Sequence, residues 1–189
     1  MATSKNKKAP KKNQGAQFEQ MINITNQVYL DKNVAVIYKK PTPIQVVKVD
    51  YPNRSHARIK EAFYKIPSTT DYNGIYRGKY IDFEAKSING TSFPFSNLHK
   101  HQIEHLIKVY EHGAIAFLIV LFNDYNEIYL LDVVDLSKLY IASLNDGRKS
   151  IPYSYFKEHA YLVPQNNPEI VDYIKIIEKV YFGELWKYF

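Results

Sequence analysis

The sequence predicts a mixed α/β fold in which helices flank a central sheet, and three segments carry this prediction. Residues 114–122, A-I-A-F-L-I-V-L-F, are apolar throughout, as expected of a strand buried on both faces. Residues 79–86, K-Y-I-D-F-E-A-K, alternate in the manner of a second strand, and residues 18–30 space their apolar side chains as an amphipathic helix does. A chain of 189 residues is long enough to bury one such core.

Shorter patterns predict the remaining elements. Apolar runs at 34–38 and 44–49 indicate two more strands. A helix is predicted over 97–112, with Asn97 suited to cap its start and Gly113 to end it. The C-terminal part adds a turn at 123–126, a strand at 127–134, a short helix capped by Asp135 through Ala142, another helix within 150–159 and a closing helix within 168–182.

The chain divides into a basic arm and one domain. Residues 1–14 are polar and lysine-rich without periodicity, which predicts a disordered arm, and residues 15–189 show no internal repeat and no second domain. Net charge is +6, and the N-terminal part carries it: residues 38–65 hold seven Lys and Arg against two acids, whereas residues 87–189 are net negative. This asymmetry favours a polyanionic partner such as nucleic acid.

Composition excludes several classes of protein. The chain contains no cysteine, which excludes disulfides and thiolate metal sites and suits a reducing compartment. No stretch is apolar enough to span a bilayer, and residues 1–15 lack the hydrophobic core of a signal peptide. We therefore expect a cytoplasmic protein with no membrane partner.

Residues 68–86, S-T-T-D-Y-N-G-I-Y-R-G-K-Y-I-D-F-E-A-K, gather the candidate chemistry. They read as two extended runs, with turn-compatible residues at Asn73-Gly74 and Arg77-Gly78. Side chains two apart in a strand share a face, so the second run has one polar and one apolar face. The polar face carries Asp82, Glu84 and Lys86, and the apolar face carries Ile81, Phe83 and Ala85.

Two acids on one strand face are unfavourable unless a cation or a substrate compensates them. Asp71 precedes Glu84 by thirteen residues, and Thr69 shares the face of Asp71, so the first run can bring oxygen ligands beside the second. Carboxylates and neutral oxygens are the ligands of Mg²⁺, and Lys86 would stand beside them as a point charge for a phosphate. The alternative is an edge hairpin whose Glu and Lys side chains only promote solubility.

Two further groups bear on binding. Gln102 can lend an amide oxygen to a metal or its water, whereas the nearby histidines lack the spacing of a zinc site and are interpreted as polar or phosphate-facing. Residues 51–67 mix basic and aromatic side chains, which suits a nucleic-acid surface, although the rings of an ordinary basic loop could also return to the core. The histidines near Gln102 are His99, His101, His105 and His112.

Six short segments form a pattern more specific than the acids and lysine alone. They are V-I-Y-K-K-P-T-P-I-Q-V-V-K-V-D at 36–50, S-T-T-D-Y-N-G at 68–74, K-Y-I-D-F-E-A-K at 79–86, T-S-F-P at 91–94, H-Q-I-E-H at 101–105 and N-D-G-R-K-S-I at 145–151. With these segments the chain, from about Gly15 to its C-terminus, resembles the RecU family of bacterial Holliday junction resolvases, within the PD-(D/E)-x-K nuclease superfamily.

The resemblance implies a restriction-endonuclease-like α/β fold, with a mixed central sheet flanked by helices and a projecting basic stalk at 51–67. It implies a homodimer that nicks two strands of four-way junction DNA symmetrically and that contacts a RecA-type recombinase. The implied Mg²⁺ positions, at which Mn²⁺ is an alternative, are Thr69, Asp71, Glu84 and Gln102, the implied transition-state lysine is Lys86, and the implied acid of the first helix is Glu19.

The implied DNA contacts follow the basic segments. Arg54 falls on an important stalk arginine of the family, and Gln14 stands before Gly15 where many members have arginine. The other expected DNA-binding residues are Arg58, Lys60, Tyr64 and Lys65 in the stalk, Lys39 and Lys40 before it, and Lys11 and Lys12 in the arm. Two alternatives stay open: a nuclease for other branched or duplex DNA, and a non-catalytic protein that binds junctions or a recombinase.

Overall fold

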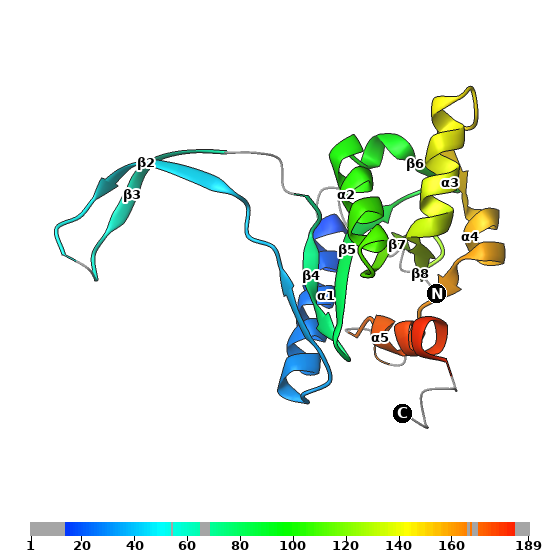
Figure 1. Cartoon of the computed structure of the whole chain (residues 1–189), viewed down its shortest axis with the longest axis horizontal. Helices are drawn as coiled ribbons and strands as arrows, with labels where there is room; N and C mark the ends of the chain where they lie inside the picture. The colour runs from blue at the N-terminus through cyan, green and yellow to red at the C-terminus, as the bar shows by residue number, and fades with distance from the viewer. Residues whose placement is uncertain (1–13, 54, 65–68, 166, 168–169, 184–189) are drawn as a thin grey trace, which may run out of the picture.

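A computed structural model describes residues 14–53, 55–64, 69–165, 167 and 170–183 of the chain (Figure 1). The predicted basic arm therefore lies outside the described residues, apart from Gln14, which begins the first helix.

A six-stranded mixed sheet is the centre of the fold. Its strands lie in the order β1 (Val36–Lys39), β4 (Tyr72–Tyr76), β5 (Lys79–Ile88), β7 (Ile115–Phe122), β8 (Glu127–Asp132) and β10 (Tyr161–Leu162). The neighbours β5 and β7 are parallel, and the other neighbouring pairs are antiparallel. The predicted mixed sheet with its buried strand at 114–122 is confirmed.

Helices cover both faces of this sheet. One face is covered by α1 (Gln14–Asp31), α5 (Tyr173–Ile177) and the π-helical turn Glu178–Phe182, and the other by α2 (Lys100–Glu111), α3 (Val133–Leu144) and α4 (Tyr153–His159). A two-stranded pair, β6 (Ser92–Pro94) and β9 (Ser150–Pro152), and the 3₁₀ turn Phe95–Asn97 join the second layer. Among the residues that the structure places, no helix has the length and apolar character needed to cross a bilayer.

A stack of aromatic rings holds the central strands in register. The rings of Tyr72 and Phe83 stack with centroids 4.9 Å apart, and those of Phe83 and Phe117 with centroids 4.7 Å apart, so that β4, β5 and β7 are joined on one face. A slip of one residue would turn every side chain of a strand to the other face. The stack therefore keeps Glu84 and Lys86 on the opposite face, towards α2.

Two predicted helix caps are wrong. The helix after β6 begins at Lys100 and is capped by His99, because the Gln102 side chain accepts the His99 N–H at 2.9 Å in a capping box. Asn97 lies in the preceding 3₁₀ turn instead. The next helix begins at Val133, since Asp132, and not Asp135, accepts the N–H of Val134 at 2.7 Å.

One predicted turn is also wrong. Asn73-Gly74 lies inside β4, and the chain reverses at Arg77-Gly78, where both residues have positive φ (49° and 76°) as a two-residue hairpin turn requires. Gly74 is needed for a close approach to β1: a Cβ there would lie 2.1 Å from the carbonyl oxygen of Val36 and 2.5 Å from the Cα of Ile37. The glycine therefore permits strand pairing instead of a turn.

The stalk is larger than the predicted insertion. The strands β2 (Ile44–Asp50) and β3 (Arg58–Tyr64) pair only with each other in the described part of the chain, and together they project away from the sheet (Figure 1). The sequence predicts residues 44–49 to be a strand outside the stalk, but every described residue of both strands is exposed. Their apolar side chains do not join the core of this chain, so the stalk begins directly after β1.

Replacing Gly74 by alanine tests the close approach of β4 to β1. The added methyl group would overlap backbone atoms, so we expect the free energy of unfolding to fall by about 1–3 kcal/mol. Gly15→Ala is the matched control, because a Cβ at Gly15 meets nothing within 4 Å and alanine favours the helix. Urea unfolding of both variants measures the difference, and equal stability of Gly74→Ala and the unmodified chain would contradict it.

Candidate active site

Antiparallel pairing of β4 with β5 brings the two predicted carboxylates together. The N–H of Asp71 donates to Glu84 Oε2 at 3.0 Å, and the N–H of Ala85 donates to Asp71 Oδ2 at 3.4 Å. Glu84 has no exposed surface, whereas Asp71 is partly exposed at the edge of the site. The predicted convergence of Asp71 and Glu84 is therefore present.

Two side chains, one from α2 and one from β5, contact the other oxygen of Glu84. Gln102 Nε2 donates to Glu84 Oε1 at 2.7 Å, and Lys86 Nζ lies 2.5 Å from the same oxygen. The amide oxygen of Gln102 accepts the His99 N–H, so its predicted position beside the acids is present but its oxygen is engaged in the helix cap. In this arrangement Gln102 orients Glu84.

The electrostatics of the pair follow from burial. Burial and the neighbouring Asp71 charge raise the pKa of Glu84 from 4.5 to about 7, although the Lys86 ammonium opposes the shift. Burial, followed by the charges of Glu19, Asp71 and Glu84, also raises the pKa of the Tyr72 phenol. A concentration of negative charge in a buried place is the environment that a cation would stabilise.

Glu19 lies on α1 and contacts residues at β1 and β4. Its carboxylate pairs with Lys39 at 2.5 Å, and both side chains are partly exposed. The Tyr72 hydroxyl donates to the Glu19 carbonyl oxygen at 3.3 Å and to Asn23 Oδ1 at 3.1 Å, which ties α1 to β4. The predicted acid of the first helix thus lies beside Tyr72, the residue after Asp71, and the predicted DNA contact Lys39 is its partner.

Lys40 occupies a different place from the DNA-facing one that the sequence predicted. Its side chain is 14% exposed, and its ammonium lies 2.8 Å from Asp82, a fully buried acid on β5. It also contacts the hydroxyls of Thr69 at 3.1 Å and Thr70 at 2.5 Å. Thr69 itself is exposed beside Asp71, and its predicted ligand role stays a prediction.

The histidines do not form a zinc site. Nowhere in the described ranges do three His, Cys, Asp or Glu side chains converge to hold a metal ion. The rings of His99 and His101 stack with centroids 5.3 Å apart, and His105 contacts Asp82 through Nε2 at 3.0 Å. A hard cation at this site would therefore take two carboxylates and neutral oxygens.

Similarity to known proteins assigns the chain to a family. The sequence profile of the family described as RecU, Recombination protein U, matches residues 13–179. The chain belongs to the RecU family. A relative named Holliday junction resolvase RecU from Bacillus cytotoxicus is 51% identical over 181 residues, covering 95% of this chain and 90% of the relative. One of the same name from Geobacillus sp. (strain WCH70) is 50% identical over 172 residues, covering 90% of this chain and 86% of the relative.

Among solved structures, the chain is similar to that of Hjc from Archaeoglobus fulgidus, titled a Holliday junction resolvase from an archaeal hyperthermophile. The two are 14% identical with a TM-score of 0.45, and the match covers 76% of this chain and 93% of that chain.

In this RecU-family chain the predicted DNA-binding residues of the stalk are partly described. Arg58, Lys60 and Tyr64 are exposed on β3, with Tyr64 83% exposed, and Lys60 pairs with Asp50 at 2.9 Å. The stalk can therefore present cations and rings to a partner. The predicted contacts Arg54, Lys65, Lys11 and Lys12 lie outside the described residues.

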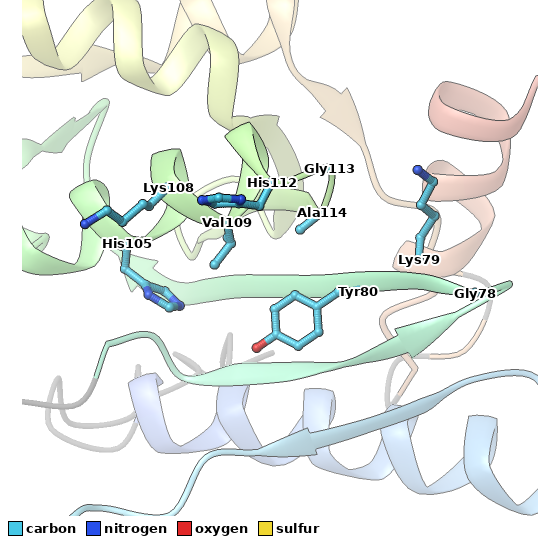
Figure 2. Close-up of a pocket in the computed structure, with 9 residues that line it drawn as sticks. All are labelled: Gly78, Lys79, Tyr80, His105, Lys108, Val109, His112, Gly113 and Ala114. Atoms are coloured by element: carbon cyan, nitrogen blue, oxygen red, sulfur yellow. The ribbon is translucent and has the colours of Figure 1, made fainter.

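Sequence reasoning missed the buried polar group around Asp82. The Tyr80 hydroxyl donates to Asp82 Oδ2 at 3.0 Å, and the rings of Tyr80 and His105 lie at a cavity of about 660 Å³ between β5 and α2 (Figure 2). Strand alternation did place Asp82 on the face of Glu84, which was the available signal. Its partners other than Tyr80 come from separate segments that no local pattern connects.

Substitutions that remove charged neighbours should shift the pKa of Glu84 in opposite directions. Asp71→Asn removes a cause that raises this pKa, so it should fall below about 7, and Lys86→Met removes a cause that lowers it, so it should rise. Carboxyl ¹³C NMR titration of metal-free protein measures both shifts. Glu158→Gln, at an exposed site on α4, is the control, and shifts of the same sign in both variants would contradict the described geometry.

The raised pKa of Glu84 also predicts how stability depends on pH. Between about pH 4.5 and 7 folded Glu84 keeps a proton that unfolded Glu84 has lost, so its contribution to the free energy of unfolding falls as pH rises. The loss should be on the order of 1–3 kcal/mol and be complete above pH 7. Urea unfolding with EDTA at pH 5 and 8 should show Glu84→Gln gaining stability relative to the unmodified chain at pH 8, and an unchanged difference would contradict it.

Proposed function

We propose that this RecU-family chain is a Mg²⁺-dependent endonuclease that resolves four-way DNA junctions as a homodimer, cutting two symmetry-related strands. The convergence of Asp71 and Glu84, with Lys86 on the same carboxylate, carries the proposal. The chain matches relatives named Holliday junction resolvase RecU over most of their length, which supports the choice of substrate.

The oxygen donors of the site fit a hard divalent cation. Asp71 and Glu84 would hold the ion, and the Thr69 hydroxyl lies on the adjoining segment as a neutral oxygen donor. Mg²⁺ retains several waters and needs few protein carboxylates, and Mn²⁺ is the alternative. When bound, the ion would supply Lewis-acid stabilisation of the phosphate and a more acidic water.

Other side chains of the site would stabilise charge, orient Glu84 and contact the DNA. Lys86 is partly exposed, so its ammonium can stabilise negative charge that develops at the phosphate while it neutralises Glu84. Gln102 fixes the orientation of Glu84 from the start of α2. Glu19 and Lys39 form a partly exposed charged pair, in which Lys39 can also reach a DNA phosphate.

The stalk supports the junction and dimer parts of the proposal. Basic and aromatic side chains on β3 suit phosphates and unpaired bases at a branch point. Large apolar side chains are exposed on both stalk strands, and such a surface is typical of a protein interface. These are Ile44, Val46, Val47, Val49, Ile59 and Phe63. Two-fold symmetry would present two active sites to two strands. Contact with a RecA-type recombinase stays a prediction from the resemblance.

Nicking assays on a mobile four-way junction test the active site. Asp71→Asn, Glu84→Gln and Lys86→Met should each lower the Mg²⁺-dependent nicking rate by about 10²-fold or more, since each removes electrostatic stabilisation of the transition state. Junction binding measured with EDTA should be retained, and Glu158→Gln on α4 should nick normally. Calorimetric titration with Mn²⁺ should detect binding to the unmodified chain and much weaker binding to Asp71→Asn.

Substrate comparison distinguishes the alternatives. Equal rates on the junction and on linear duplex of the same sequence would indicate a nuclease without junction preference. Junction binding without any Mg²⁺-dependent or Mn²⁺-dependent nick would indicate a non-catalytic binding protein.

A further inference from the structure

A buried acid lies beside the candidate active site and contacts four other side chains. Asp82 has no exposed surface, and Oδ2 accepts from Lys40 Nζ at 2.8 Å and from the Tyr80 hydroxyl at 3.0 Å, with His105 Nε2 also at 3.0 Å. The Thr70 hydroxyl donates to its other oxygen. A buried carboxylate with so many partners is fixed in position.

Lys40 contacts both places where the stalk joins the sheet, which we call the outgoing root (at Lys40) and the returning root (at residues 69–71). It follows β1 directly, where the chain leaves for β2, and its N–H donates to the Asp71 carbonyl oxygen at 2.8 Å. Its ammonium reaches the hydroxyls of Thr69 and Thr70, where the chain has returned from β3. One side chain therefore ties the outgoing and returning connections to Asp82 on β5.

The same contacts touch the active site. Asp82 precedes Glu84 by two residues and shares its strand face, while Thr69 and Asp71 belong to the returning root. A change in the direction of the stalk would displace Thr69 and Asp71 relative to Glu84 unless the roots are held. The Lys40–Asp82 pair is placed where it can prevent this displacement.

A buried ion pair is an inefficient way to gain stability, because removing two charges from water costs about as much as their attraction returns. Apolar side chains of the same volume would serve stability as well. What the pair supplies is a defined geometry between the stalk and β5, which is the better-attested use of such pairs.

Resting on the proposed junction cleavage, we infer that the Lys40–Asp82 pair is a positioning device: it couples the direction of the stalk to the alignment of Asp71 with Glu84, so that junction engagement leads to cutting. Lys40 and Asp82 are positioning residues, since neither needs to touch DNA or metal. Lys40 is the centre of the device, because it alone among the residues described contacts Asp82 and both threonines.

The test removes both charges together, because a single substitution would leave a buried charge unpaired. In Lys40→Met with Asp82→Asn, the single-turnover nicking rate on a four-way junction should fall by about 10²-fold, since small misplacements of reacting groups cost that much. The dissociation constant for the junction, measured with EDTA, should stay within about twofold of the unmodified chain. The unmodified chain must first nick the junction with Mg²⁺, and its failure to do so would overturn the proposed function and not the coupling.

The matched control is Lys138→Met with Asp135→Asn, which makes the same chemical changes in an exposed pair on α3, 3.4 Å apart. It should nick and bind normally. Lys40→Gln with Asp82→Asn keeps a polar contact between the two side chains and should recover part of the lost rate. If the Lys40→Met with Asp82→Asn variant nicked the junction at the control rate, the inference would be overturned. A loss of junction binding in proportion to the loss of nicking would also overturn it, because Lys40 would then be a DNA contact.

A second measurement reports the direction of the stalk itself. The chain has no cysteine, so Ser55→Cys in the stalk and Ser154→Cys on α4 can carry two spin labels without other changes. Pulsed electron resonance on labelled protein, diluted with unlabelled chains, should give a broader distance distribution in the Lys40→Met with Asp82→Asn variant than in its control. An unchanged distance distribution would show that the pair does not hold the stalk. The same conclusion would follow if the Lys40→Met with Asp82→Asn variant were unfolded at the assay temperature while Lys40→Gln with Asp82→Asn nicked at the unmodified rate.

Discussion

Burying the Glu84 carboxylate beside Asp71 is the constraint on which the rest of the structure depends. A charged acid in such a place is costly, and each neighbour reduces the cost: Lys86 supplies a positive charge, and Gln102 and the Asp71 N–H supply hydrogen bonds. These partners do not fully offset the cost of burial or the repulsion from Asp71, and the pKa of Glu84 remains raised. The protein maintains an unfavourable concentration of charge, which is typical of a catalytic site.

The two-residue period of a strand lets the core enforce this arrangement. Phe83 stacks between Tyr72 and Phe117 on one face of β5, and its sequence neighbours Asp82 and Glu84 point to the other face. The aromatic stack is among the best buried parts of the molecule, so it fixes the strand that carries the chemistry. The packed core and the candidate site thus occupy the two faces of one strand, and the packing on one face fixes the position of the other.

Much of the fold could be predicted from the sequence, because strands and helices have local periods. The buried strand over 114–122, the amphipathic first helix and the alternation at 79–86 were all read from adjacent residues, and the strand face of Glu84 followed from them. One wrong turn prediction depended on a distant contact. Asn73-Gly74 looks like a turn locally, but Gly74 lies where β1 passes too closely for a side chain.

The same limit applies to the site. Asp71, Glu84 and Lys86 lie in one hairpin and their grouping is predicted, whereas Lys40 is predicted to bind DNA together with the other cations of the basic segments. Its burial depends on Asp82, forty-two residues away. The observed cap of α2 is His99 instead of the predicted Asn97 for a related reason. The amide of Gln102 accepts the His99 N–H through its oxygen and donates to Glu84 through its nitrogen.

The stalk meets the sheet through two chain segments, and β2 and β3 are antiparallel and exposed along their whole described length. A hairpin of this kind can be lengthened or shortened by two residues in each strand, which changes its reach by roughly 7 Å and leaves every remaining side chain on its original face. Related chains could therefore evolve a different reach into branched substrates by insertion or deletion alone, with no rearrangement at the anchorage.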